Sequence, residues 1–361
     1  MPLVAHSDLP TFRKLRAGGQ DVLTPERARS QDIRELHIGL LNMMPDAALA
    51  ATEQQYMRLV GGCNRVAQLY VHPFTVPGLE RSTATLDYVD QYYANFDHLR
   101  REGLDALIVS GANVTNPSIE LEPFWEPLQE VVAWAKDNVT SILCSCLATH
   151  ALVKHLHQID RHALPRKQWG VYSHRVRDRS HPLTLGIDTR FDAPHSRWNE
   201  VRGDELEAAG LQILADSDTA GAHLAVSPDR FRIVYFQGHP EYDYNSLLKE
   251  YKREMLRFLA GEIDQHPPYP ERYFSSEAKA LAEAYLQQVL RAKAVGDPPP
   301  EFPEDDLAFH LDNTWGDTGR AIFNNWLGLV YQLTSLDRRQ PFMPGIDPED
   351  PLGLSPSSSR P

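Results

Sequence analysis

Cysteine is scarce in this sequence, and the number of cysteines is odd. The 361 residues include only Cys63, Cys144 and Cys146. A small, odd number of cysteines does not build a disulfide framework and fits a reducing compartment better than an oxidising one. We therefore expect a cytoplasmic protein.

Long apolar runs are missing as well. No segment approaches the roughly 18 consecutive apolar residues of a membrane-spanning helix. The first stretch, MPLVAHSDLPTFRKLRAGGQ, lacks the apolar centre of a signal peptide. These absences predict a protein without a membrane span, although 42% hydrophobic residues still suffice for a sizeable core.

Positive charge is in short supply. The chain has 36 Lys and Arg against 49 Asp and Glu, which gives a net charge of -13. Such a chain is unsuited to nucleic acid or to an anionic membrane surface, and an anionic substrate would need a local basic pocket. The glycine-rich phosphate loops G-x-x-x-x-G-K-[ST] and G-x-G-x-x-G are absent too.

Apolar runs alternate with segments of helical spacing along most of the chain. Strands are predicted at 36–45, 65–74, 105–112, 140–145, 211–217, 222–228 and 230–241, and helices at 48–62, 122–138, 146–158, 245–261 and 275–296. This alternation predicts an α/β fold with a mainly parallel sheet flanked by helices. Ligands bind such sheets at the carboxyl ends of the strands.

Composition divides the chain into four parts. Residues 1–35 are polar and rich in Arg, and we expect them to form an N-terminal arm. Residues 36–274 carry the α/β pattern. Residues 275–340 are interpreted as a helical insertion, a Pro-rich acidic linker and a C-terminal segment that packs on the core. The Pro- and Ser-rich tail, 341–361, is expected to be disordered.

Two cysteines lie where a predicted strand gives way to a predicted helix, in TSILCSCLATHALVKHLHQ. The unpaired N–H groups at a helix start favour a thiolate and can stabilise an oxyanion. Cys146 stands at this start, whereas Cys144 lies deeper in the strand, so Cys146 is the better candidate nucleophile. The alternative is that both are buried small apolar residues, which is a common use of free cysteine.

A histidine and a carboxylate follow another predicted strand, in QGHPEYD. His239 and Glu241 are two positions apart, so both side chains can point the same way in an extended segment. A carboxylate that orients a histidine, which in turn activates a thiol, is the logic of a catalytic triad. The alternative is an ordinary turn in which His239 caps the next helix.

A second group of histidines raises the question of a metal site. His150, His155, His157 and His162 are close together in sequence. No carboxylate or thiol pattern with zinc-ligand spacing accompanies them, so a solvated helix face is the better interpretation. We expect no metal.

Several motifs in the same order resemble the homoserine O-succinyltransferase family: LNMMP, SILCSCLATHALV, KQWGVYSH, DAPHSRW, GHPEYD and FNNWLGLVYQLT. The resemblance implies a flavodoxin-like fold similar to class I glutamine amidotransferases. It also implies acyl transfer from an acyl-CoA to the hydroxyl of L-homoserine, early in methionine biosynthesis. In that family the matching cysteine, Cys146, carries the acyl group as a thioester, with His239 as the base and Glu241 as the acid.

The resemblance also implies substrate contacts. Lys167, Ser196 and Arg253 match the family's substrate-binding positions, and the two cations would supply local positive charge; the alternative for each is a surface cation. The backbone N–H groups of Leu147 and of Asn113, in the SGAN loop, are expected to hold the oxyanion.

The resemblance also implies that one position determines the choice between succinyl-CoA and acetyl-CoA as acyl donor. The family has Gly there in enzymes that use succinyl-CoA and Glu in those that use acetyl-CoA, whereas this chain has Thr115. A neutral threonine does not repel the succinyl carboxylate, so we favour succinyl-CoA.

Other functions stay open at this point. The same chemistry with acetyl-CoA, or with L-serine as acceptor for cysteine biosynthesis, is one alternative. A glutaminase-like hydrolase and a non-catalytic binding protein are two more. Acyl-CoA would be a co-substrate and no cofactor is expected. A homodimer is one assembly that the protein could form, and the sequence does not determine the oligomeric state.

Overall fold

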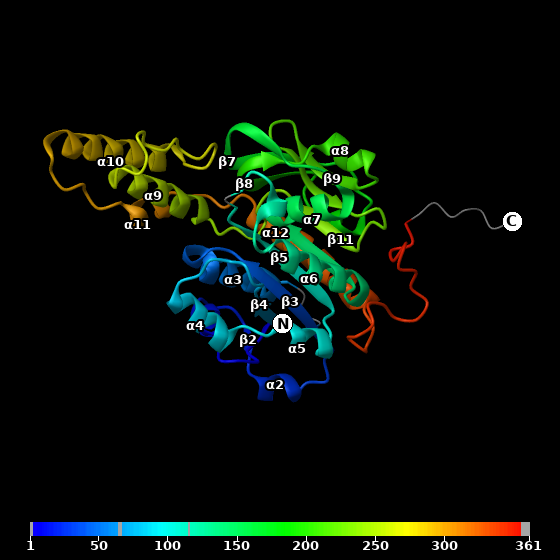
Figure 1. The fold of residues 1–361 in the computed structure, drawn as a ribbon. Helices are drawn as coiled ribbons and strands as arrows, with labels where there is room; N and C mark the ends of the chain where they lie inside the picture. The colour runs from blue at the N-terminus through cyan, green and yellow to red at the C-terminus, as the bar shows by residue number, and fades with distance from the viewer. Residues whose placement is uncertain (1–2, 64–66, 115, 355–361) are drawn as a thin grey trace.

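The computed structural model describes residues 3–63, 67–114 and 116–354, and a single eleven-stranded sheet runs through them (Figure 1). The strands are β1 (Leu3–Val4), β2 (Val22–Leu23), β3 (Glu35–Met43), β4 (Gln68–Phe74), β5 (Ala106–Ala112), β6 (Ser141–Ser145), β7 (His162–Val176), β8 (Arg190–Glu200), β9 (Gln212–Ser217), β10 (Gly221–Val226) and β11 (Ile233–Phe236). Their order across the sheet is β2-β1-β4-β3-β5-β6-β11-β10-β9-β7-β8.

Helices cover both faces of this sheet. They are α1 (Pro10–Ala17), α2 (Pro25–Arg29), α3 (Asp46–Gly61), α4 (Thr83–Tyr92), α5 (Phe96–Glu102), α6 (Trp125–Asn138), α7 (Leu147–His157), α8 (Gly203–Ala208), α9 (Ser246–Leu259), α10 (Ser276–Val295), α11 (Glu304–Phe309) and α12 (Gly316–Leu333), with short 3-10 turns η1 (Ile119–Leu121) and η2 (Pro182–Thr184). None of the helices in the described part of the chain has the length and apolar character needed to cross a bilayer.

The sheet has a parallel part and an antiparallel part. From β2 to β11 neighbouring strands run parallel, and β10, β9, β7 and β8 complete the sheet in antiparallel pairs. The predicted α/β class with a mainly parallel sheet is confirmed. The long hairpin of β7 and β8 was not predicted, because the first half of β7 is polar and largely exposed, with Pro165 inside it.

The segment predicted as an N-terminal arm is built into the sheet. Strand β1 lies beside β4, with Leu3 opposite Leu69, and pairs with β2 on its other side. Phe12 and Leu15 of α1 are buried in the core. Several apolar residues of this polar segment, among them Leu3, Leu9, Phe12 and Leu15, are therefore buried, which composition alone does not reveal.

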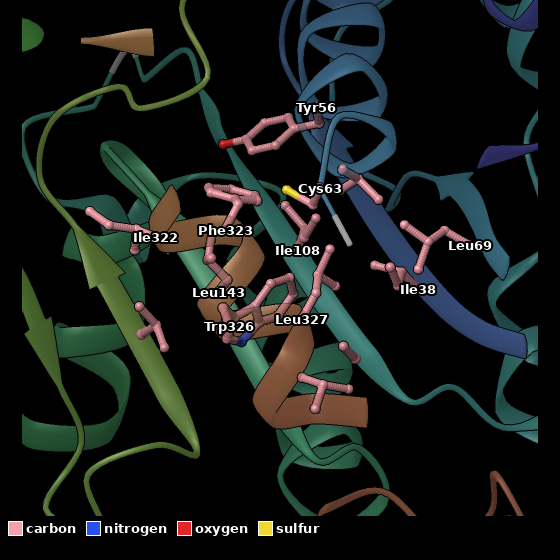
Figure 2. Packing of buried hydrophobic residues seen from close by; sticks show 14 of the residues in the cluster. Ile38, Tyr56, Cys63, Leu69, Ile108, Leu143, Ile322, Phe323, Trp326 and Leu327 are labelled. Atoms are coloured by element: carbon pink, nitrogen blue, oxygen red, sulfur yellow. The ribbon is translucent and has the colours of Figure 1, made fainter. Parts of the chain in front are cut away.

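The core has one cluster on each face of the sheet. Helices α1, α3 and α12 pack on one face, and Figure 2 shows Phe323, Trp326 and Leu327 of α12 packed close to Ile108 and Leu143 of the strands. Helices α6 and α7 contribute to the cluster on the other face. Helix α12, near the C-terminal end of the sequence, thus covers part of the core on one face of the sheet.

Two later segments complete the molecule. Helices α9, α10 and α11 project from one end of the body around their own apolar cluster (Figure 1). Of the tail predicted to be disordered, residues 341–354 are described, and Phe342 is buried under the guanidinium of Arg232, 4.9 Å from the ring centre. Residues 355–361 lie outside the described residues. The division into four parts stays a prediction.

Candidate active site

The sheet order brings the two predicted catalytic segments together. Strands β6 and β11 are parallel neighbours, with Ser145 opposite Phe236 at their carboxyl ends. The backbone N–H of Cys146 donates to the carbonyl oxygen of Phe236 at 2.8 Å. The residues that follow the two strands, Cys146 and the loop of His239, therefore meet at one edge of the sheet.

Cys146 has an unusual backbone conformation. It caps α7 with φ 52° and ψ −118°, a region that residues other than glycine rarely adopt. Holding such a conformation costs about 1 to 3 kcal/mol, and strain of this kind is concentrated at functional sites. The turn leaves Cys146 only half-buried, whereas Cys144 is fully buried in β6. Burial raises the pKa of the Cys144 thiol to about 12.

His239 is oriented by Glu241. Its Nδ1 donates to Oε1 of Glu241 at 2.7 Å, and both side chains are buried. Within the described part of the chain, Nε2 of His239 has no hydrogen-bond partner. Burial alone would lower the pKa of His239, but the Cys146 thiolate and the Glu241 carboxylate outweigh it and raise that pKa well above its ordinary value. The structure thus brings Cys146, His239 and Glu241 together in the order of a triad.

Ser145 and Tyr56 form a chain of contacts that leads to the Glu241 carboxylate. Ser145 Oγ donates to Glu241 Oε1 at 3.5 Å, and the Tyr56 hydroxyl of α3 lies 2.5 Å from Ser145 Oγ. Sequence reasoning did not single out either residue. Ser145 stands between the two cysteines. Successive side chains of a strand point to opposite faces, and this alternation was the one sequence feature that set Ser145 apart from the cysteines. Nothing in the sequence marks Tyr56.

The predicted oxyanion donors are placed differently from one another. Leu147 occupies the first position of α7, where the N–H has no intrahelical acceptor. A Cβ on Gly111 would lie 3.9 Å from both the Leu147 nitrogen and the Cys146 Cβ, so this part of the SGAN loop faces the thiol. Asn113 is exposed and lines a neighbouring groove of about 270 Å³ with Met44. Thr115, the predicted donor-specificity residue, lies outside the described residues.

Lys167 and Ser196 meet at a carboxylate that sequence reasoning missed. Glu250 of α9 accepts hydrogen bonds at Oε2 from Lys167 Nζ (3.0 Å) and Ser196 Oγ (2.6 Å), and at Oε1 from the Tyr242 hydroxyl (2.8 Å). Burial would raise the pKa of Glu250, but Lys167 above all, with Ser196 and Tyr242, lowers it below the ordinary value. The cluster is therefore a partly buried Lys–Glu ion pair, linked through Tyr242 to the triad.

Arg253 does not join this cluster through any described contact. It lies on α9, three positions after Glu250, and the spacing places both residues on one side of the helix. Its side chain is 58% exposed and pairs with Glu254 at 3.0 Å. Of the three predicted substrate-binding residues, the structure thus brings Lys167 and Ser196 together and leaves Arg253 at the surface nearby.

The four histidines considered for a metal do not converge. His150 contacts Gln237 Oε1, His155 contacts Gln129, His157 contacts the Tyr235 hydroxyl and His162 contacts Glu205. These partners lie on different elements, so each histidine serves local packing. The interpretation as one solvated helix face is wrong for His150, which is 4% exposed.

A different histidine cluster lies behind the catalytic loop. Nitrogen atoms of His174, His195 and His223 lie within 4.8 Å of one another, and the three residues are buried. Arg197 Nε donates to His195 Nδ1 at 3.3 Å, which leaves the proton of His195 on Nε2, 3.1 Å from His174 Nε2. The Nε2 lone pair that a metal needs on His195 is then absent, and the buried guanidinium opposes a second cation. The cluster instead packs against Gly238, where a Cβ would lie 2.9 Å from two of its nitrogens.

Comparisons with known proteins point to one family. Residues 2–336 match the sequence model of the homoserine O-succinyltransferase family. Relatives named homoserine O-succinyltransferase include those of Methylococcus capsulatus (60% identical, covering 98% of this chain and 100% of the relative), Methylobacter tundripaludum (59%, 98% and 100%) and Nitrosococcus oceani (58%, 98% and 99%).

Solved structures of similar architecture include two glutamine amidotransferases. That of Thermotoga maritima is 9% identical and has a TM-score of 0.43, covering 82% of this chain and 97% of that one. That of Methylobacillus flagellatus is 12% identical with a TM-score of 0.42, covering 82% and 95%.

Proposed function

This chain belongs to the homoserine O-succinyltransferase family, and from that membership we propose that it transfers the succinyl group of succinyl-CoA to the hydroxyl of L-homoserine. The product, O-succinylhomoserine, belongs to methionine biosynthesis. The observation that carries the proposed mechanism is Cys146 at the strained start of α7, beside the buried His239–Glu241 pair. Acyl-CoA is a co-substrate, and the proposed route uses no cofactor.

The first half-reaction acylates the enzyme. The Cys146 thiol gives its proton to His239 Nε2, and the thiolate attacks the thioester carbonyl of the donor. We assign the stabilisation of the oxyanion to the N–H of Leu147 and to the SGAN backbone; a Cβ on Gly111 would lie 3.9 Å from the Leu147 nitrogen, which supports this assignment. The bond between the acyl carbon and the CoA sulfur then breaks, and CoA leaves with the proton from His239. The succinyl group remains on Cys146 as a thioester.

The second half-reaction transfers the group to the acceptor. His239 takes the proton of the homoserine hydroxyl, and the oxygen attacks the thioester on Cys146. The C–S bond breaks, the oxyanion collapses, and O-succinylhomoserine leaves. Glu241 holds His239 in the tautomer that keeps Nε2 free to accept a proton, and its charge stabilises the imidazolium.

The Lys–Glu pair suits an amino-acid acceptor. A free amino acid carries an ammonium and a carboxylate, and the site offers the opposite charges in Glu250 and Lys167, with Ser196 between them. The ammonium is placed at Glu250 and the carboxylate at Lys167, with Arg253 one turn away as a second cation. A partly buried ion pair of zero net charge favours a zwitterion over an anion or a cation.

A donor-by-acceptor activity matrix tests the proposed function. Succinyl-CoA and acetyl-CoA are each offered with L-homoserine and with L-serine, and CoA release is measured. Steady release is expected to require the acceptor and to be fastest with succinyl-CoA and homoserine. A preference for acetyl-CoA of tenfold or more, which corresponds to about 1.4 kcal/mol, would contradict the donor assignment. Steady release without acceptor would instead favour a hydrolase.

The covalent intermediate gives a separate prediction. Incubation with succinyl-CoA alone is expected to add one succinyl group to the peptide that contains Cys146, because a ping-pong route acylates the enzyme before the acceptor binds. Peptide mass spectrometry after acid quenching measures the adduct. An enzyme that turns over both substrates but never carries the succinyl group would support direct transfer.

We further propose that the enzyme is cytoplasmic and assembles as a homodimer. Light scattering measures the mass of the assembly and so tests the homodimer.

A further inference from the structure

One side chain touches both the catalytic base and the carboxylate of the acceptor cluster. The ring of Tyr242 stacks on the ring of His239, with the ring centres 4.0 Å apart and 19° between the planes. The hydroxyl of the same residue donates to Glu250 Oε1 at 2.8 Å. Tyr242 therefore spans the distance between the base and the ion pair.

The position of Tyr242 is fixed from outside the site. Trp315 Nε1 donates to the carbonyl oxygen of Tyr242 at 2.8 Å. Helix α12 lies so close to the loop that a side chain at Gly319 would meet the carbonyl oxygen of Pro240 at 2.8 Å. The backbone of the loop is thus held at Pro240 and Tyr242, and the Tyr242 side chain lies between His239 and Glu250.

The Tyr242 hydroxyl is the donor in its hydrogen bond to Glu250. Burial, together with the carboxylates of Glu250 and Glu241, raises its pKa well above the ordinary value. A neutral hydroxyl whose acceptor is an ionised carboxylate holds its proton toward that carboxylate. At neutral pH the Tyr242 hydroxyl is therefore protonated and donates to an ionised Glu250.

We infer that Tyr242 is a positioning residue that couples acceptor recognition at Glu250 to the orientation of His239. The inference rests on the proposed function, in which the acceptor ammonium binds Glu250. An acceptor bound there shares the carboxylate with Tyr242, whose ring sets the plane of the imidazole. The acceptor hydroxyl and the base are then aligned through two short contacts. The first half-reaction does not use Glu250, so this alignment serves the second half-reaction alone.

A space-filling role is the alternative, and the hydroxyl separates the two. Tyr242→Phe keeps the ring, its stacking on His239 and its volume, and removes only the bond to Glu250. A residue that merely fills space tolerates this change. Tyr244→Phe is the matched control, because Tyr244 lies two positions further along and its side chain is 43% exposed.

The experiment measures the two half-reactions separately. Rapid mixing with succinyl-CoA alone gives the rate of the first CoA burst, and steady-state turnover at varied L-homoserine gives kcat/KM for the acceptor. Tyr242→Phe is expected to change the burst rate by no more than about twofold and to lower the acceptor kcat/KM at least tenfold, which is about 1.4 kcal/mol. Tyr244→Phe is expected to change neither.

A double-mutant cycle with Glu250→Gln completes the test. If the two side chains act as one unit, adding Tyr242→Phe to Glu250→Gln lowers the acceptor kcat/KM no further. Additive effects would overturn the coupling, as would a Tyr242→Phe enzyme that uses the acceptor normally or is slowed equally in both half-reactions. Should Tyr242→Phe not fold, the steady-state constants of Glu250→Gln decide: a lower kcat at saturating L-homoserine with an unchanged burst rate supports the coupling, and a loss confined to the KM for L-homoserine contradicts it. A wild-type enzyme without burst or transfer would instead overturn the proposed function.

Discussion

Cys146→Ser is expected to abolish acyl transfer, while Cys144→Ser retains most of it. Removing the nucleophile of a triad costs at least about 10³-fold in kcat, because the remaining groups cannot supply covalent catalysis. Cys144 is buried in β6, donates only a weak bond to the carbonyl oxygen of Val234 at 3.5 Å, and is not ionised because burial raises its pKa to about 12. Initial rates of CoA release with both substrates measure the difference.

Thiol labelling provides the control for this comparison. Iodoacetamide is expected to modify Cys146 rapidly in the folded enzyme and to leave the buried Cys63 and Cys144 unmodified. Circular dichroism verifies that each serine variant is folded. A folded Cys144→Ser enzyme without activity, next to an active Cys146→Ser enzyme, would show that the helix start does not select the nucleophile.

Stability is expected to fall steeply as the solution becomes acidic. Burial lowers the pKa of His150 to about 3 and of His174 to about 4, and it lowers the pKa values of His195 and His223 well below the ordinary range. Below pH 6.5 the unfolded chain binds protons that these folded residues refuse, so the free energy of unfolding decreases as pH falls. His150 and His174 each cost about 2 kcal/mol at pH 5, and His195 and His223 act in the same direction, against a usual total of about 5 to 15 kcal/mol.

Thermal unfolding at pH 7.5 and pH 5 measures this effect, with an expected fall in Tm of at least about 5 °C. His150→Gln is expected to flatten the dependence, because it removes one group that titrates only in the unfolded state. His98→Gln serves as the control, since His98 is exposed on α5. A Tm that is unchanged between the two pH values would contradict the assignment of these histidines as buried and neutral.

The triad was predictable because each of its residues lies shortly after a strand that a short apolar run indicates. Cys146 follows one apolar run and His239 follows another, and parallel strands bring their carboxyl ends to one edge. The two-residue spacing of His239 and Glu241 sufficed to predict their contact, which the structure shows at 2.7 Å. The position of such a residue in the fold is determined by the strand that precedes it. Strands of this kind can be predicted from short apolar patterns in the sequence.

The surroundings of the triad were not predictable in the same way. Glu250 lies in a helix segment rich in charges, LKEYKRE, where nothing in the sequence distinguishes the carboxylate that meets Lys167 from Glu254, which pairs with Arg253 and Arg257. Tyr56 reaches Ser145 only because α3 packs on the sheet. Such residues enter the site through the packing of whole helices, which no short pattern encodes. The same holds for the hairpin of β7 and β8, because the polar half of β7 forms a strand by pairing with β8 and not through an apolar pattern of its own.

The packing of α12 has a consequence for the synthesis of the chain. Strand β6 ends at Ser145 and α12 begins at Gly316, about 170 residues later, so at translation rates of about 5 to 20 residues per second the two are made roughly 9 to 34 s apart. Throughout that interval the apolar face that Trp326 will cover is open on the nascent chain. The catalytic loop, too, waits for Trp315 before its backbone is held. A chain that ends before α12 would carry all three triad residues and expose the apolar face that α12 covers in the finished protein, so we expect it to aggregate.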